Sequence, residues 1–196
     1  MAYMKSISVY CASSTLIDET YVLAAQELGT LMAKNGLRLI YGGGDRGLMG
    51  AVAKGVLEAG GEAVGVIPRF MVEAGWQHRG LTELIEVEDM SARKKLMEEI
   101  SDGCIALPGS VGTFDELMEI IALKKLGLYL KPVVILNTNH FYAPLQTLLQ
   151  KSIDERFMHP GYTELWDFVD TPAEALDKIL HTPLADQRTI WNMTAI

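Results

Sequence analysis

A glycine-containing turn followed by two carboxylates makes the segment Pro108-Gly-Ser-Val-Gly-Thr-Phe-Asp-Glu116 a candidate for chemistry. The apolar residues before it predict a buried strand, and apolar periodicity predicts a helix that begins near Thr113. Backbone N–H groups at such a turn bind phosphate, and the helix N-terminus adds partial positive charge. Of Asp115 and Glu116 in the first helical turn, one would compensate the helix dipole. The other would repel a phosphate unless it faces another group, so we expect chemistry beyond phosphate binding.

The run Arg93–Lys95 brings three cations to the start of another predicted helix, which has Ser91 as its N-cap. Cations are unfavourable there because the helix N-terminus is already partly positive, and a bound anion would remove this conflict. Alternatively, the two lysines lie in a solvated turn and pair with Glu98 and Glu99 four residues further on. The fourth residue after Arg93 is a methionine, so the functional interpretation is favoured for Arg93 and the solvated one for the lysines.

The glycines Gly42, Gly44 and Gly47 match the dinucleotide-binding pattern G-x-G-x-x-G between a predicted strand and a predicted helix. The acidic residue expected about 20 positions later is missing, and the pattern follows the second strand instead of the first. Arg69, after the next strand, would at best suit a 2′-phosphate. Tight packing of helix on strand is the structural alternative. The pattern therefore favours a nearby nucleotide or phosphate over a true dinucleotide site.

Ser110 lacks the sequence context of a catalytic nucleophile. A nucleophile elbow needs glycine two residues before and two residues after the serine, and Pro108 occupies the earlier place. A serine that contacts phosphate, or that only forms the turn, is the favoured interpretation. The four histidines and the cysteines Cys11 and Cys104 show no metal-ligand spacing. We therefore expect no catalytic metal.

Short β-rich runs alternate with helical patterns along the chain, which predicts an α/β fold with a parallel sheet and crossover helices. Ligands bind such sheets where the chain leaves the C-terminal ends of the strands, and the turns at 11–14, 42–45 and 108–113 stand at those ends. The predicted strands are Ser6–Tyr10, Leu37–Tyr41, Glu62–Ile67, Glu83–Val87, Gly103–Leu107, Pro132–Leu136 and Trp166–Val169. The predicted helices are Asp18–Asn35, Gly47–Ala59, Ser91–Ile100 and Thr113–Leu126.

Length and composition predict a single globular domain over residues 1–196, in which the tail after Pro183 has no clear period and stays unassigned. The net charge of −8 argues against a nonspecific nucleic-acid or membrane-surface binder. No apolar stretch approaches the length of a membrane span, and the N-terminus lacks a signal-peptide core. Two lone cysteines suit a reducing compartment. The expected setting is the cytoplasm.

Four ordered motifs together resemble the LOG (Lonely Guy) family of cytokinin-activating phosphoribohydrolases, often labelled possible lysine decarboxylase. The resemblance covers nearly the whole chain and implies a Rossmann-like sheet, mostly parallel and flanked by helices on both faces. It also implies homodimers or larger homo-oligomers built on dimers. The implied reaction hydrolyses the N-glycosidic bond of nucleoside 5′-monophosphates, such as AMP or cytokinin riboside 5′-monophosphates, to free base and ribose 5-phosphate. The motifs are Tyr41-Gly-Gly-Gly44, Gly47-Leu-Met-Gly50, Met90-x-x-Arg93-Lys94 and Pro108-Gly-x-x-Gly112-Thr113-x-x-Glu116.

The resemblance assigns roles to residues of this chain. Arg93 and Glu116 fall on the family's catalytic pair, no cofactor is implied, and no segment reads as a pyridoxal-phosphate lysine site. The remaining substrate-binding positions are the phosphate loop with Gly109, Ser110, Val111, Gly112 and Thr113, together with Gly43, Gly44, Glu73 and Lys94.

Two positions depart from the family pattern. Ser110 replaces the second glycine of the P-G-G run, which would cost about 1 kcal/mol if that position needs a positive φ. Its hydroxyl would alternatively donate to the phosphate. Asp115 stands where many members have glutamate, which keeps the charge. Both departures leave the catalytic pair in place.

Two other functions stay open from the sequence. An NADP-dependent oxidoreductase would use the glycines after the second strand together with Arg69. A non-catalytic carrier of a nucleotide-like cofactor would share the fold and the glycine turns without needing the pair Arg93 and Glu116. The phosphoribohydrolase ranks above both.

Overall fold

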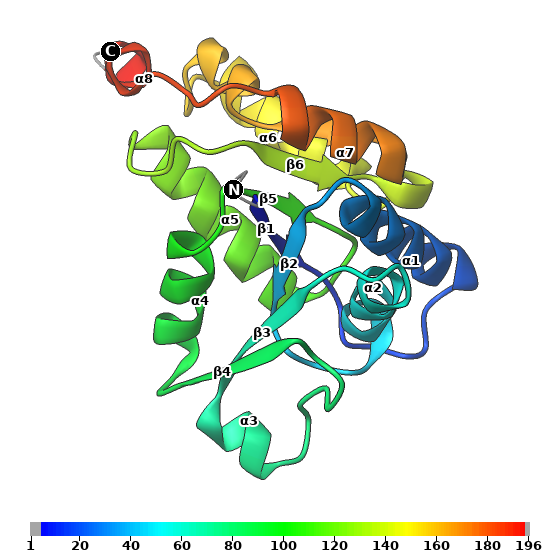
Figure 1. The fold of residues 1–196 in the computed structure, drawn as a ribbon. Coiled ribbons are helices and arrows are strands. Elements are labelled where there is room, and N and C mark those ends of the chain that lie inside the picture. Colours follow the sequence, from blue (N-terminus) through cyan, green and yellow to red (C-terminus); the bar gives the residue numbers. More distant parts are fainter. Residues whose placement is uncertain (1–4, 195–196) are drawn as a thin grey trace.

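A seven-stranded parallel sheet forms the centre of the protein, in the order β4-β3-β2-β1-β5-β6-β7 (Figure 1). The computed structural model describes residues 5–194, so the first four and last two residues of the predicted domain lie outside the described part. The predicted α/β class with a parallel sheet is confirmed. The strands are β1 (Ser6–Tyr10), β2 (Arg38–Tyr41), β3 (Ala63–Pro68), β4 (Glu83–Val87), β5 (Gly103–Ala106), β6 (Val133–Leu136) and β7 (Asp167–Val169).

Helices cover both faces of the sheet and bury one apolar cluster on each side (Figure 1). One face packs against α1 (Glu19–Lys34), α2 (Gly47–Glu58) and α7 (Pro172–His181). The other packs against α4 (Met90–Glu99), α5 (Val111–Lys125) and α6 (Ala143–Asp154), joined by α8 (Gln187–Thr194) and the short 3-10 helix η2 (Pro160–Leu165). A five-residue helix, α3 (Arg69–Glu73), follows β3 and buries none of its residues.

Side-chain alternation in β1 explains how one strand serves both clusters. Ile7 and Val9 point to the α1, α2 and α7 face, whereas Tyr10 belongs to the cluster under α4 and α5. Successive side chains of a strand point to opposite faces, so a central strand of a covered sheet is apolar on both. All five residues of β1 are accordingly buried.

Two helix starts differ from the sequence prediction. Helix α4 begins at Met90 with Asp89 as its N-cap, instead of Ser91, because the Asp89 carboxylate accepts a hydrogen bond from the Ala92 N–H at 2.8 Å. Helix α5 begins at Val111, two residues before the predicted Thr113, with Ser110 as its N-cap. Asp115 and Glu116 therefore lie in the second turn of α5, beyond the strongest field of the helix dipole.

The sheet reverses its winding direction at β1, which lies between β2 and β5. From β1 the chain moves outward through β2, β3 and β4, and then crosses back to β5 for the other half. Such a reversal leaves a crevice beyond the C-terminal ends of the two diverging strands, where α/β proteins bind ligands. The turns after β1, β2 and β5 therefore meet at one place.

Candidate active site

The backbone of Ala12, in the turn after β1, is hydrogen-bonded to two other segments of the crevice. Its N–H donates to the Pro108 carbonyl at 3.3 Å, and its carbonyl accepts from the N–H groups of Leu48 and Met49 at 2.9 and 3.3 Å. The Tyr41 hydroxyl also donates a hydrogen bond to the Gly44 carbonyl at 3.1 Å, which holds the glycine turn (residues 42–45) in place. The turn after β1 is thus bonded to the turn after β5 and to the first residues of α2, which follow the glycine turn.

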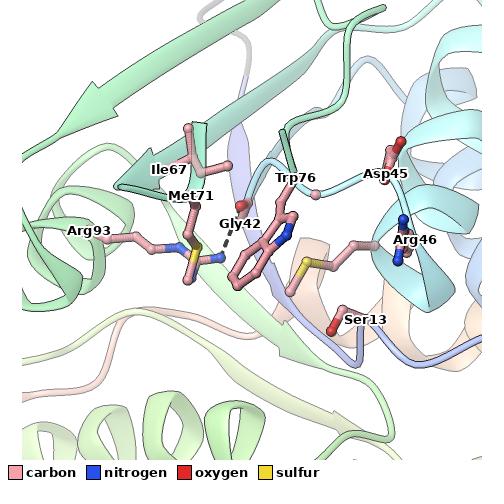
Figure 2. A pocket seen from close by; sticks show the side chains of 10 residues that line it. Ser13, Gly42, Asp45, Arg46, Ile67, Met71, Trp76 and Arg93 are labelled. Atoms are coloured by element: carbon pink, nitrogen blue, oxygen red, sulfur yellow. Dashed lines mark hydrogen bonds between the residues drawn. The ribbon is translucent and has the colours of Figure 1, made fainter. Parts of the chain in front are cut away.

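A cavity of about 300 Å³ opens beside these turns (Figure 2). Its lining combines apolar side chains with two arginines, a carboxylate and a serine, which is typical of a site for a small polar ligand with an apolar part. The lining residues are Ser13, Gly42, Gly44, Asp45, Arg46, Met49, Ile67, Met71, Trp76 and Arg93.

Arg93 is buried to 4% exposure at the start of α4, where backbone carbonyls hold its guanidinium. Nε donates to the Val66 carbonyl at 3.1 Å and Nη2 donates to the Gly42 carbonyl at 2.9 Å, the bond drawn in Figure 2. Nη1 lies 3.6 Å from the sulfur of Met90. A Cβ at Gly42 would lie 1.7 Å from Nη2, so glycine is required for this arrangement.

Arg93 pairs with no carboxylate among residues 5–194, although a buried guanidinium is usually neutralised by an anion. Burial lowers the pKa of Arg93, and the charge of Glu116 opposes that shift. A guanidinium carries five N–H donors, and the carbonyl bonds use only two of them. The remaining donors and the uncompensated charge suit an anionic ligand in the cavity.

Glu116 is the second buried charge of the crevice, with 7% exposure on α5. Its carboxylate makes no hydrogen bond or ion pair with any other residue that the structure describes. Burial raises its pKa to about 7, while the charges of Arg93 and Lys94 oppose the rise and those of Asp115 and Glu119 add to it. A carboxyl group with a pKa near 7 changes its charge in the physiological range, as catalytic acids and bases do.

Lys94 resolves the conflict of the two neighbouring carboxylates on α5. Its ammonium group forms ion pairs with Asp115 at 2.9 Å and with Glu119 at 2.5 Å, so Asp115 faces α4. The alternative pairing of Lys94 with Glu98 is not seen among the described residues, whereas Lys95 pairs with Glu99 at 3.9 Å. Glu116 lines a separate small pocket, with Tyr10, Lys94, Glu98, Glu119 and Ile120, and is not among the residues that line the cavity beside Arg93.

The first turn of α5 carries no side-chain cap, so its backbone donors stay available. Val111 and Gly112 are exposed there, and Thr113 is buried beneath the turn. Ser110 has a φ of −108°, so the cost expected for a left-handed serine does not arise. At Gly109 a Cβ would lie 2.1 Å from the Thr113 hydroxyl oxygen, which makes this the glycine that the loop needs.

The other predicted binding residues lie at different distances from the cavity. Gly44 lines it, and Gly43, with a φ of 73°, lies in the same turn. Glu73 and Arg69 are exposed on α3 and are not among the lining residues. Trp76, which does line the cavity, was not predicted because it follows a helix too short to produce a periodic pattern.

Residues 5–194 contain no group of three or more histidine, cysteine, aspartate or glutamate side chains arranged to hold a metal ion. Within the same range, no helix has the length and apolar character needed to cross a membrane. Cys11 and Cys104 are free and buried, and burial raises the pKa of the Cys11 thiol, which makes it a poor nucleophile.

Comparison with known proteins decides the family. The family model described as possible lysine decarboxylase matches residues 49–179. A cytokinin riboside 5′-monophosphate phosphoribohydrolase of Rhodococcoides fascians is 43% identical, over 80% of this chain and 80% of that protein. One from Arabidopsis thaliana is 39% identical, over 89% of this chain and 77% of that protein. The chain belongs to the LOG family.

Solved structures with the LOG-like fold include proteins of other function. The molybdenum cofactor carrier protein of Chlamydomonas reinhardtii is 25% identical with a TM-score of 0.70, over 91% of this chain and 99% of that one. The molybdenum cofactor binding protein of Rippkaea orientalis is 21% identical with a TM-score of 0.69, over 92% and 98%, and this likeness concerns the fold alone. These proteins share the Rossmann-like architecture predicted from the sequence.

Proposed function

We propose that this protein hydrolyses the N-glycosidic bond of nucleoside 5′-monophosphates, AMP or cytokinin riboside 5′-monophosphates, to free base and ribose 5-phosphate. The observation that carries the proposal is a pair of buried, oppositely charged groups, Arg93 and Glu116, each of which shifts the pKa of the other. Arg93 has no carboxylate partner and Glu116 has no hydrogen-bond or ion-pair partner among residues 5–194. The activity in the names of the relatives supports the same reaction.

In this proposal the 5′-phosphate binds at the first turn of α5. Residues 109–113 supply free backbone donors at a 15-residue helix, whose dipole favours an anion at that end. The Ser110 hydroxyl is exposed beside them and is a further donor. Lys94 acts indirectly, because its ammonium group holds Asp115 and Glu119 and so keeps their charges away from the phosphate.

Glu116 and Arg93 then act on the ribose. As the bond between C1′ and the base nitrogen breaks, positive charge develops on the ribosyl ring, and the Glu116 carboxylate stabilises it. Water adds its oxygen to C1′, and one of its protons ends on the departing base. Arg93, fixed by the Gly42 and Val66 carbonyls, holds the anionic substrate in register with this carboxylate.

The decisive experiment incubates the purified protein with AMP and with isopentenyladenosine 5′-monophosphate and measures ribose 5-phosphate. We expect turnover by the wild-type protein and a loss of at least about 100-fold in kcat/KM for Glu116→Gln and for Arg93→Met. Lys95→Gln is the matched control, because this exposed lysine lies on the same helix and, within residues 5–194, pairs only with Glu99. Its kcat/KM should stay near that of the wild-type protein.

The outcomes separate the alternatives. Tight nucleotide binding without ribose 5-phosphate would support a carrier function, and hydride transfer from NADPH would support an oxidoreductase. Full activity in both Glu116→Gln and Arg93→Met would keep the reaction but refute these residue roles.

We also propose that the protein forms a homodimer, or a larger assembly built on dimers, through the outer face of α5. Exposed apolar side chains follow each other three and then four residues apart in the N-terminal half of α5, and a further one lies at its C-cap. They are Val111, Phe114, Met118 and Leu126. Sedimentation analysis should give a dimer or a multiple of it, and Met118→Glu should dissociate it. A monomeric wild-type protein would refute this proposal.

We place the protein in the cytoplasm. Its support is that Cys11 and Cys104 are free and buried, as is usual where thiols stay reduced. Recovery with a cytosolic marker after cell fractionation tests it.

A further inference from the structure

The segment 76–78 lies across the glycine turn like a strap and is bonded to it. The His78 N–H donates to the Gly43 carbonyl at 2.8 Å, and Gln77 forms an antiparallel bridge with Gly44. The Trp76 N–H in turn donates to the Met71 carbonyl at 3.0 Å, which closes the end of α3. The backbone of Trp76 is therefore held on both sides, and its position relative to Arg93 is set by the glycine turn that also holds Arg93.

The Trp76 indole projects into the cavity instead of packing in the core (Figure 2). Its residue is 53% exposed, although tryptophan is usually well buried. Met49, Ile67 and Met71 line the same part of the cavity and offer no hydrogen-bonding side-chain groups apart from weakly accepting sulfurs. An exposed aromatic face surrounded by apolar side chains is a surface that a flat ring would cover.

The cavity lies next to the proposed phosphate turn (residues 109–113), although none of those residues lines it. Ser13 lines it, and the preceding residue Ala12 is bonded to Pro108 at the start of that turn. Arg93 lines the cavity between these two regions. A nucleotide whose phosphate lies at α5 and whose ribose lies beside Arg93 therefore has its base directed toward Trp76.

We infer that Trp76 is a specificity-determining residue, whose indole stacks on the base of the bound monophosphate. The inference rests on the proposed binding of a nucleoside monophosphate. A purine presents two fused rings to the indole and a pyrimidine presents one, so stacking favours the larger base.

The test compares ligand affinities in wild-type protein and in Trp76→Ala, measured by isothermal titration with AMP, UMP and ribose 5-phosphate. Loss of base stacking should weaken AMP binding by about 5- to 150-fold. UMP should lose less, so the AMP-to-UMP affinity ratio falls, and ribose 5-phosphate should bind as before. Trp76→Phe keeps an aromatic face and should retain most of the preference. In turnover, Trp76→Ala should raise KM for AMP with little change in kcat.

Trp191→Phe is the matched control. Trp191 is similarly exposed at 51% but lies on α8, where its Nε1 donates to the Leu126 carbonyl. AMP should quench the fluorescence of Trp191→Phe, which keeps Trp76, and the quenching should be lost in Trp76→Phe.

Unchanged AMP affinity in Trp76→Ala overturns the inference. So does an equal loss for AMP, UMP and ribose 5-phosphate, which would indicate a structural role. If AMP binds with the expected Trp76 dependence but no ribose 5-phosphate forms, the proposed hydrolysis fails while the base-selecting role stands.

Discussion

Replacing Glu116 by glutamine tests how much the burial of a charged carboxylate at this position lowers the free energy of unfolding. Burial raises the pKa of Glu116 from 4.5 to about 7. A carboxyl group whose pKa is higher in the folded protein contributes stability that is fully present below its unfolded pKa and is lost as pH rises through its folded pKa. Each pH unit between the two values removes about 1.4 kcal/mol, so the wild-type protein should lose roughly 3 kcal/mol between pH 4 and pH 8.

Glutamine has the same shape and does not titrate in this range. The free energy of unfolding of Glu116→Gln, relative to wild type, should therefore rise by roughly 3 kcal/mol from pH 4 to pH 8. Urea unfolding followed by circular dichroism at several pH values measures this difference. Burying the glutamine amide changes this difference by the same amount at every pH. Only the dependence of the difference on pH is therefore compared with the expectation.

Glu119→Gln serves as the control, because it removes a negative charge three positions away on the same helix. Its carboxylate is 44% exposed and pairs with Lys94, and such surface pairs contribute about 1 kcal/mol or less. A difference between Glu116→Gln and wild type that stays flat with pH, or that falls as pH rises, would refute the reasoning. Glu116 would then be hydrated or paired in solution.

Three further outcomes are expected. For the free enzyme, kcat/KM with AMP should decline as pH falls below about 7, because protonation neutralises the Glu116 carboxylate, and a flat acid limb would count against its charged role. Gly42→Ala should fold, as judged by circular dichroism, yet lose about 100-fold in kcat/KM because its methyl group displaces Arg93; unchanged kinetics would contradict the assigned position of Arg93. Burial lowers the pKa of Lys124 from 10.5 to about 8. In urea unfolding, the stability of wild type relative to Lys124→Met should therefore rise by roughly 3 kcal/mol from pH 7.5 to pH 10.5. A constant difference would show that burial does not disfavour the charged ammonium group.

The sheet was predictable because its strands are short β-rich runs that alternate with helical patterns, and β1 and β4 have the bounds that the sequence predicted. Helices α3, α6, α7 and α8 were not predicted. Helix α7 nevertheless carries a local signal, since Thr171 and Glu174 form a reciprocal capping box. Helix α3 has five residues and buries none, so no periodic pattern could have revealed it.

The site was predictable where a residue conflicts with its local setting. Arg93 stood out as a cation at a helix N-terminus, and its burial without a carboxylate partner follows that conflict. The pairing of Lys94 with Asp115 was not predictable, because it joins two helices across 21 positions of sequence. The same holds for Trp76, because the bridge between its neighbour Gln77 and Gly44 depends on how β3 and β4 are connected in space.

The backbone bonds of Ala12 limit where substrate preference can be altered in this fold. One residue connects the turn after β1 to the turn after β5 and to the first residues of α2, so an insertion in any of them would disturb the other two. Among residues 5–194, the strap at 76–78 is bonded to Gly43 and Gly44 through backbone groups, and replacing its side chains would leave these bonds in place. Exchanging this short segment between relatives should therefore transfer base preference as a module, while the phosphate turn and the buried charge pair remain intact.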